Sequence, residues 1–164
     1  MKQTVKLSLL WDAENRVFHA VECLPGEVHE MNTLKALVDS VRLRIRRLFG
    51  DRGFSSRENV QHLADKGITP VIRPQGRATP KSRGCPAWRE HVSEDRELGY
   101  ERWKIKTGYG KRFEEEHTIS ALVNRFGDEV RARSIRTASK LLCARIALHN
   151  FFAFLFNAAQ VATM

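Results

Sequence analysis

Strand-like and helix-like stretches alternate along this chain, and their order limits the folds open to it. Two apolar runs, Val5–Trp11 and Val17–Cys23, flank the turn-like DAEN and predict a β-hairpin. Apolar residues spaced by three and four then predict a helix over 34–45. A short strand over 47–50, a helix and a strand reading ITPVIR follow. This order predicts an α/β fold with a mixed sheet flanked by helices.

The helix after the short strand has recognisable end signals. Ser55 followed by Glu58 matches a capping box, and Gly67 is suited to end the helix. Beyond the next strand, residues 74–98 hold three of the five prolines together with Arg77, Lys81, Arg83 and Arg89. Since this stretch shows no periodicity, it predicts a basic loop or insertion.

The chain closes with two predicted helices. They cover 112–125 and 130–156, within a helical region of residues 110–160. The second is apolar enough to resemble a membrane span, but an arginine, a histidine and two asparagines interrupt it. We therefore expect a buried terminal helix and no membrane partner, within one domain of residues 1–164.

Positive charge and cysteine spacing restrict the class of partner and the compartment. The chain carries 28 Lys+Arg against 19 Asp+Glu, a formal net charge of +9. This excess favours a polyanionic partner, most often nucleic acid, because phosphates attract basic side chains and release counterions. The three cysteines are widely spaced without a CxxC pair. That spacing excludes a standard zinc framework and indicates a reducing, cytoplasmic compartment.

Acidic residues at two places are candidate functional groups. Asp51 follows a predicted strand, where sites assemble in open α/β sheets, although a turn aspartate is the other interpretation. In GYGKRFEEEHTISALVNRFGD three glutamates begin a predicted helix. At about 100° per residue Glu114 points away from the apolar side, whereas Glu115 and Glu116 both lie near it. Acidic residues that favour the helix dipole explain the same run.

Two segments carry a family resemblance. They read GDRGFSSRENVQHLADKGITPVIRP and WKIKTGYGKRFEEEHTISALVNRFGDEVRARS. Both resemble the catalytic core of DDE transposases from bacterial and archaeal insertion sequences. The most similar group carries a Tyr-x2-Arg-x3-Glu-x6-Lys signature, which reads here Tyr109, Arg112, Glu116 and then Val123. GDRGFSS is similar to the segment with the second catalytic aspartate, here Asp51.

This resemblance implies a ribonuclease-H-like mixed sheet and DNA transposition by metal-dependent cleavage and strand transfer. Asp51 and Glu116 would be two of three carboxylate ligands of Mg²⁺ or Mn²⁺, which favour hard oxygen ligands. Arg112 and Tyr109 would contact DNA phosphate near the scissile position. The implied partner is double-stranded DNA, both as transposon ends and as target.

The resemblance leaves the first catalytic aspartate unassigned. In the family it lies on a first strand upstream of a KLSLL-like strand, and residues 1–5 hold no acidic side chain. Asp12 is the nearest candidate, but it falls in the predicted hairpin turn. We therefore expect a partial catalytic core that lacks its first strand. Its open strand edge would pair in a homodimer or with a complementing transposase chain. The alternative is a noncatalytic basic nucleic-acid-binding remnant, which valine at position 123 favours.

Overall fold

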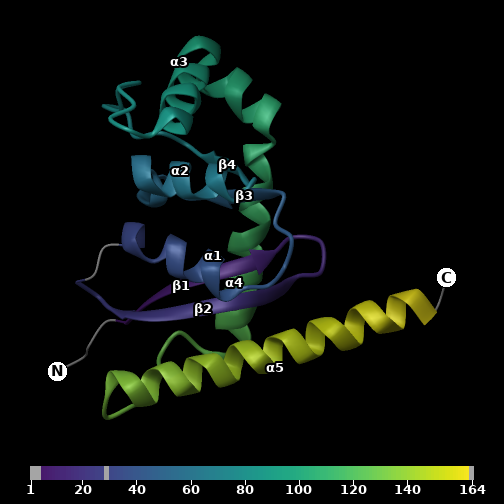
Figure 1. Ribbon diagram of the computed structural model, residues 1–164. Helices are drawn as coiled ribbons and strands as arrows, with labels where there is room; N and C mark the ends of the chain where they lie inside the picture. The colour runs from purple at the N-terminus through teal and green to yellow at the C-terminus, as the bar shows by residue number, and fades with distance from the viewer. Residues whose placement is uncertain (1–4, 28–29, 163–164) are drawn as a thin grey trace. The chain divides into compact units, whose positions relative to one another are not determined.

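The chain folds into two compact units, each with its own pair of strands. The computed structural model describes residues 5–27 and 30–162 (Figure 1). One unit combines Met1–Val28 with Phe113–Met164, and the other comprises His29–Arg112. Both contain helices and strands, so the predicted α/β class is confirmed in its coarse form.

The first unit is built on the predicted hairpin. Strands β1 (Val5–Asp12) and β2 (Val17–Pro25) pair antiparallel, with a bulge between Leu10 and Trp11. Asp12 closes the connecting turn: its carboxylate accepts hydrogen bonds from the backbone amides of Glu14 and Asn15 at 2.8 and 3.1 Å. The side-chain amide of Asn15 donates a further bond of 2.8 Å. The turn therefore depends on this one carboxylate.

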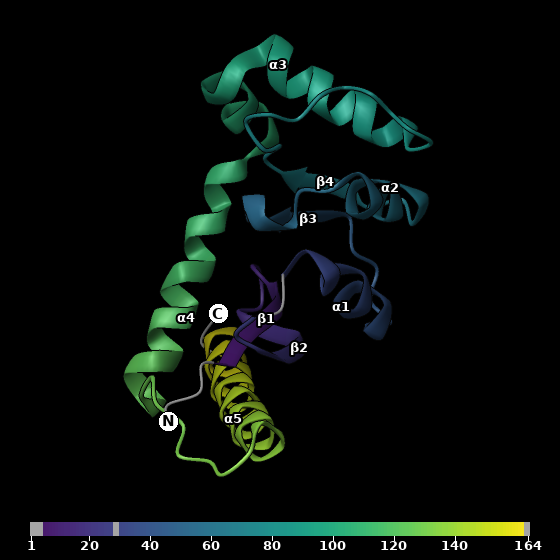
Figure 2. The same cartoon turned by 90° about the vertical axis from the view of Figure 1, so that its left-hand side faces the viewer.

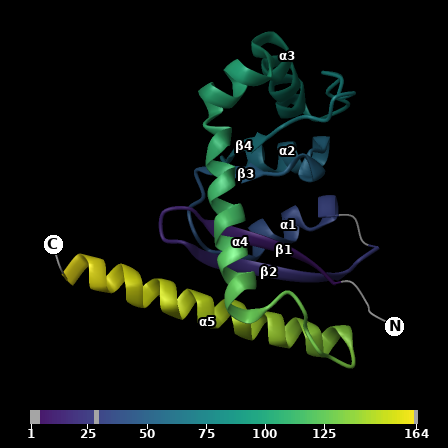
Figure 3. The ribbon, with the colours of Figure 1, turned by 180° about the vertical axis from the view of Figure 1, so that it is seen from behind.

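Two helices cover the hairpin. Helix α4 runs over Phe113–Phe126 and α5 over Ile135–Ala162, as Figure 3 shows from behind. The core of the unit is formed by Phe18 of β2, Leu122 of α4 and Ile146 of α5, which are buried together. Both predicted C-terminal helices are therefore confirmed, although α5 begins and ends later than predicted.

The side-chain amide of Asn150 fastens α5 to β2. Its Oδ1 accepts a hydrogen bond from the backbone N–H of Phe18 at 2.9 Å, and its Nδ2 donates to the carbonyl of Phe18 at 2.8 Å. The amide thus takes the place that a further strand would occupy beside Phe18. Asn157 adds a bond of 3.0 Å to the carbonyl of Asn15.

The predicted burial of the terminal helix is wrong. Only 6% of its most apolar window is buried, and by length and composition residues 135–160 could cross a membrane. The asparagines that interrupt the apolar run bond the hairpin, so they dock one face of the helix and leave the rest uncovered. Its exposed large apolar side chains are Ile135, Leu141, Leu148, Phe151, Phe152, Phe154, Leu155 and Phe156.

The second unit is built on a parallel pair of strands. Strand β3 (Arg47–Gly50) lies beside β4 (Thr69–Ile72). Helices α2 and α3 pack against each other over this pair (Figure 2). The helices of the unit are α1 (Leu34–Ser40), α2 (Arg57–Asp65) and α3 (Pro86–Thr107). Three short 3₁₀ turns, η1 to η3, cover Glu30–Asn32, Arg52–Phe54 and Tyr109–Arg112.

Two element ends in this unit differ from those predicted. The helix expected over 34–45 ends early, because Val41 has extended backbone angles (φ −102°, ψ 141°). The residue that caps α2 is Ser56, whose Oγ accepts a hydrogen bond from the amide of Asn59 at 3.1 Å. The capping role predicted for Ser55 is therefore displaced by one residue, and Ser55 is buried instead.

About half of the basic loop predicted over 74–98 is helical instead. Helix α3 begins at Pro86, which occupies a first-turn position where its missing N–H costs nothing. Trp88 and Val92, four residues apart, pack on Val60 of α2 in a buried cluster. This pair, spaced by four residues, is the apolar periodicity of the helix. It is too short to be recognised among the surrounding charged residues.

The described strands pair two by two. The hairpin forms one two-stranded sheet and the parallel pair forms another. Nothing among the described residues joins them into the single mixed sheet that the sequence predicted. The ribonuclease-H-like arrangement therefore stays a prediction.

The double hydrogen bond from Asn150 makes a testable contribution to the first unit. In Asn150→Ala, both backbone groups of Phe18 lose their partner at a half-buried position. We expect the protection of the Phe18 amide against hydrogen exchange to fall by about 1–3 kcal/mol. The control is Asn157→Ala, which removes one exposed bond and should change that protection much less. Equal losses in both variants would contradict the role given to Asn150.

The Asp12 turn predicts a dependence of stability on acidity. Burial raises the pKa of this carboxyl, but the hydrogen bonds from Asn15, His19 and Glu14 outweigh it and lower the pKa below 3.8. A lowered pKa in the folded state stabilises the fold above about pH 4, and this contribution disappears as pH falls through the folded value. Thermal melting from pH 6 to pH 2 should therefore show a lower melting temperature for Asp12→Ala than for the wild-type protein near pH 6. The two melting temperatures should become equal near pH 2, and a difference that does not change with pH would contradict the assignment.

Candidate functional site

Asp51 lies at the carboxyl end of β3, on the surface of the second unit. Its Oδ1 accepts a hydrogen bond of 2.7 Å from the amide of Arg52 and so caps the following 3₁₀ turn. Both interpretations of this residue hold at once: it is a turn aspartate, and it is an exposed carboxylate at a strand end. A side chain in this position is accessible to a ligand while its backbone is held by the parallel pair.

Tyr109 is packed behind the strand that leads to Asp51. Its ring lies 5.1 Å from that of Trp103, and 8% of the residue is exposed. Its hydroxyl donates to the carbonyl of Gly50 across 3.4 Å, a long hydrogen bond. The structure therefore brings the signature tyrosine to the end of β3, where it supports the backbone that carries the aspartate.

Gly50 makes this strand end unusually close to its neighbour. A Cβ atom there would lie 3.0 Å from Cγ1 of Ile72 on β4, so a side chain at this position would require the Ile72 side chain to shift. Arg47, at the other end of β3, donates a 2.8 Å hydrogen bond to the carbonyl of Thr107 at the end of α3. The strand that precedes Asp51 is thus fixed at both ends, a detail that sequence reasoning missed because neither partner is near in sequence.

The rest of the signature lies beyond this packed region. Residues 109–112 form a 3₁₀ turn and α4 begins at Phe113, so Tyr109 and Glu116 do not lie on one continuous α-helix. Glu116 is exposed on α4 and belongs to the first unit. The side chains of Arg112, Glu114 and Glu115 lie outside the described residues. The structure therefore brings Tyr109 to the Asp51 strand and assigns Glu116 to the other unit.

The carboxylates do not make a complete metal site within the described part of the chain. Asp51 and Glu116 offer the hard oxygen atoms that Mg²⁺ prefers. No group of three His, Cys, Asp or Glu side chains suited to a metal ion occurs among the described residues. Asp12 is engaged in its turn by three hydrogen bonds from neighbouring residues. The residues present therefore supply parts of a ligand set, and no reaction step can be derived through a metal from them.

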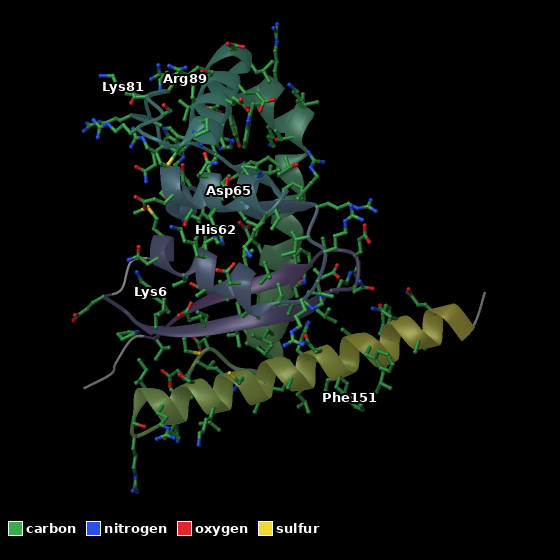
Figure 4. All side chains as sticks on the ribbon, viewed as in Figure 1. Lys6, His62, Asp65, Lys81, Arg89 and Phe151 are labelled. Atoms are coloured by element: carbon green, nitrogen blue, oxygen red, sulfur yellow. The ribbon has the colours of Figure 1, made fainter. Side chains whose placement is uncertain are left out.

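The loop before α3 presents basic side chains on a firmly held backbone. Nε1 of Trp88 donates to the carbonyl of Thr79 at 2.9 Å, and Arg96 donates to that of Ala78 at 2.8 Å. Nε of Arg57 donates to the carbonyl of Lys81 at 3.0 Å. Figure 4 shows Lys81 and Arg89 extending outward on the same side of this unit. The exposed cations of this surface, which we call the basic loop, are Arg77, Lys81 and Arg83 before α3 and Arg89 in its first turn.

His91 lies beneath this surface and is a structural residue. It packs between the rings of Trp88 and Trp103. Its Nε2 lies 2.6 Å from the carbonyl of Ile72, which can only accept, so Nε2 carries the hydrogen. Burial lowers the pKa of His91 below 6.5, and the imidazole is neutral at pH 7. It therefore adds no charge to the basic loop above it.

Comparison with known proteins gives one finding. A family model described as a transposase DDE domain matches residues 2–151. No curated protein and no solved structure matches the chain. The matched range contains Asp51 at its strand end, the buried Tyr109, Glu116 and the basic loop. Because it covers most of the sequence, the chain belongs to the transposase DDE domain family.

Proposed function

We propose that this protein is a DNA transposition enzyme that acts by metal-dependent cleavage and strand transfer. Its substrate is double-stranded DNA, as transposon ends and as target. Asp51 and Glu116 are two carboxylate ligands of Mg²⁺ or Mn²⁺, within a ribonuclease-H-like core. When bound, such cations would supply Lewis-acid stabilisation of the negative charge that develops on the phosphate oxygens. The third ligand is a carboxylate that the described residues do not identify.

The observation that carries this proposal is the exposed position of Asp51 at the end of a fixed parallel strand. The family match supplies the reaction class, and the local structure supplies an accessible carboxylate with a supported backbone. Tyr109 acts as a positioning residue. It is buried behind Gly50, where it supports the strand end and has little surface available to contact DNA. Arg112, by the same family pattern, contacts phosphate near the scissile position.

The basic loop supplies the second requirement, which is affinity for the DNA backbone. Its cations are exposed on a backbone whose carbonyls are already engaged by Trp88, Arg96 and Arg57. Arginine and lysine side chains presented in this way neutralise phosphates and release counterions. We therefore place the DNA duplex over this loop in the second unit.

A noncatalytic DNA-binding remnant is the second candidate. It is favoured by the lack of a three-residue metal group among the described residues and by valine at position 123. In this case the basic loop would bind DNA and the carboxylates would have no chemical task. The two candidates differ in whether cleavage accompanies binding.

Removing either carboxylate distinguishes the transposition enzyme from the noncatalytic DNA-binding remnant. With a duplex that carries the ends of the encoding element, the wild-type protein should nick DNA in Mg²⁺ but not in EDTA. Asp51→Asn and Glu116→Gln should each lower the nicking rate by at least about a hundredfold, since a metal ligand is lost. DNA binding, measured by fluorescence anisotropy, should stay within about twofold in both variants.

The matched controls are Asp65→Asn and Asp128→Asn, one exposed aspartate from each unit. Both should nick DNA like the wild-type protein. Nicking that survives in Asp51→Asn and Glu116→Gln would exclude the proposed carboxylate roles. Wild-type binding without any nicking would establish the noncatalytic candidate.

The basic loop predicts a measurable salt dependence. In Lys81→Ala/Arg83→Ala, two phosphate contacts are lost, so the slope of log K against log salt should become shallower by about 2. Binding to unrelated duplexes should weaken to the same extent, because phosphate contacts carry no sequence information. The measurement is anisotropy between 50 and 300 mM salt, about the range in which such slopes are resolved.

Arg102→Ala is the control for this experiment, since it removes an exposed cation of the same unit outside the basic loop. It should leave the slope close to that of the wild-type protein. An unchanged slope in the double variant would show that DNA does not lie over the loop.

A further inference from the structure

Helix α5 carries a regular apolar seam on the face that the fold leaves uncovered. Leucines recur every seven residues, and between them runs a second series of alanine and phenylalanine with the same period. This is the a/d pattern of a coiled coil. The six positions, all exposed, are Leu141, Ala144, Leu148, Phe151, Leu155 and Ala158. We call them the α5 seam.

The orientation of the seam is fixed by the opposite face of the helix. Ile146 enters the core with Phe18, and Asn150 bonds the backbone of β2. These contacts set the rotation of α5 about its axis. Phe151 consequently projects from the side turned away from the hairpin, as Figure 4 shows. Burying the seam would therefore require no rearrangement of the unit.

We propose that the α5 seam is an interface for a second copy of this chain, packed as an antiparallel pair of helices. In such a pair each a position faces a d position of the partner. Centred between positions 148 and 151, the layers place leucine opposite alanine at both ends and leucine opposite phenylalanine in the middle. A large side chain thus meets a small one in every outer layer, which lets the helices approach closely.

Charge selects the antiparallel direction. The exposed cations Arg136 and Lys140 lie before the seam, whereas the helix beyond Arg145 has no Lys, Arg, Asp or Glu. A parallel pair would set the cations of both copies side by side. An antiparallel pair sets them beside the uncharged end of the partner helix, where the helix dipole is negative.

Four large side chains of the α5 seam and three phenylalanines beside it, Phe152, Phe154 and Phe156, expose the apolar surface that a pair of helices could use. From Leu141 onward, the exposed fractions of the seven large apolar side chains on α5 range from 43% to 67%. With typical side-chain areas they amount to roughly 700 Å² per copy, close to the roughly 800 Å² per partner of a standard interface. Over about 26 Å of helix the seam also has the length of a short coiled coil.

A hollow beside the first half of the seam can receive the partner. It has a volume of about 730 Å³ and is open to solvent. Leu141 and Leu148 line one wall, and Phe126 and Val130, at and after the end of α4, line another. In the antiparallel pair this hollow faces the partner's larger aromatic side chains, which lie in the second half of its helix.

A membrane is a poorer occupant of this face than a second copy. A span would require α5 to leave the hairpin, which breaks the paired bonds of Asn150 and the bond of Asn157. Each of these polar groups would then need a partner inside the bilayer, at a cost of several kcal/mol by general estimates. The inference is independent of the proposed function, because it concerns no residue of the candidate site.

The test is the oligomeric state of the full chain, measured by sedimentation velocity from about 1 to 100 μM, the range of ordinary protein associations. The wild-type protein should sediment as a dimer at the upper end. Leu148→Glu/Phe151→Glu buries charge at the centre of the pair and should raise the dissociation constant at least about a hundredfold. Both positions are exposed in the single copy, so helicity by circular dichroism should be unchanged.

Ile105→Glu is the matched control, because Ile105 is 81% exposed and lies on α3. This variant should dimerise like the wild-type protein. A wild-type protein that stays monomeric at 100 μM would overturn the inference. A dimer that persists in Leu148→Glu/Phe151→Glu would overturn it as well, because the contact would then lie elsewhere.

Direction is tested by cross-linking in a Cys143→Ser background, where the exposed native cysteine is removed. A mixture of Leu141→Cys and Ala158→Cys chains should form the mixed disulfide dimer on oxidation, and neither chain alone should form one readily. Disulfides formed by Leu141→Cys alone would overturn the antiparallel arrangement. Flotation with vesicles of phosphatidylcholine and phosphatidylglycerol completes the test: a monomer that floats with them would replace the second copy by a membrane.

Discussion

Two strands alone form a marginal sheet in water, and each unit of this protein must compensate for that shortage. The hairpin does so through α5, whose asparagine side chain completes the hydrogen bonding of Phe18. The parallel pair does so through helices packed against it, with Val71 of β4 buried against Trp103 of α3. The two parts of the protein to which we assign functions, α5 and the strand end at Asp51, therefore both lie where other elements stabilise a two-stranded sheet.

Local patterns in the sequence predicted most elements but not their partners. The hairpin, the strand before Asp51 and the end of α2 just before Gly67 (φ +70°) follow from short-range signals, and all are present. Helix α3 was missed because its buried side has few apolar residues among many charges. The docking of α5 could not be predicted because Asn150 interrupts an apolar helix in the sequence. Its hydrogen-bond partner, the backbone of Phe18, lies more than 100 residues earlier.

The candidate site shows the same division between local and distant information. The exposure of Asp51 follows from its place after a strand, and its position could be predicted from sequence. The hydrogen bonds of Tyr109 and Arg47 that support that strand join residues about 60 positions apart, and local sequence patterns do not predict such contacts. The family pattern identifies Glu116, which lies on α4 of the first unit, whereas Asp51 lies in the second.

The firmly held basic loop has a consequence for the thermodynamics of association. A flexible basic segment loses conformational freedom when a duplex orders it, and that loss subtracts from the affinity. Here the bonds from Trp88, Arg96 and Arg57 fix the loop during folding, before any ligand arrives. Association should therefore carry a small entropic penalty for the backbone, so that ordering of the loop offsets less of the electrostatic gain from the exposed cations.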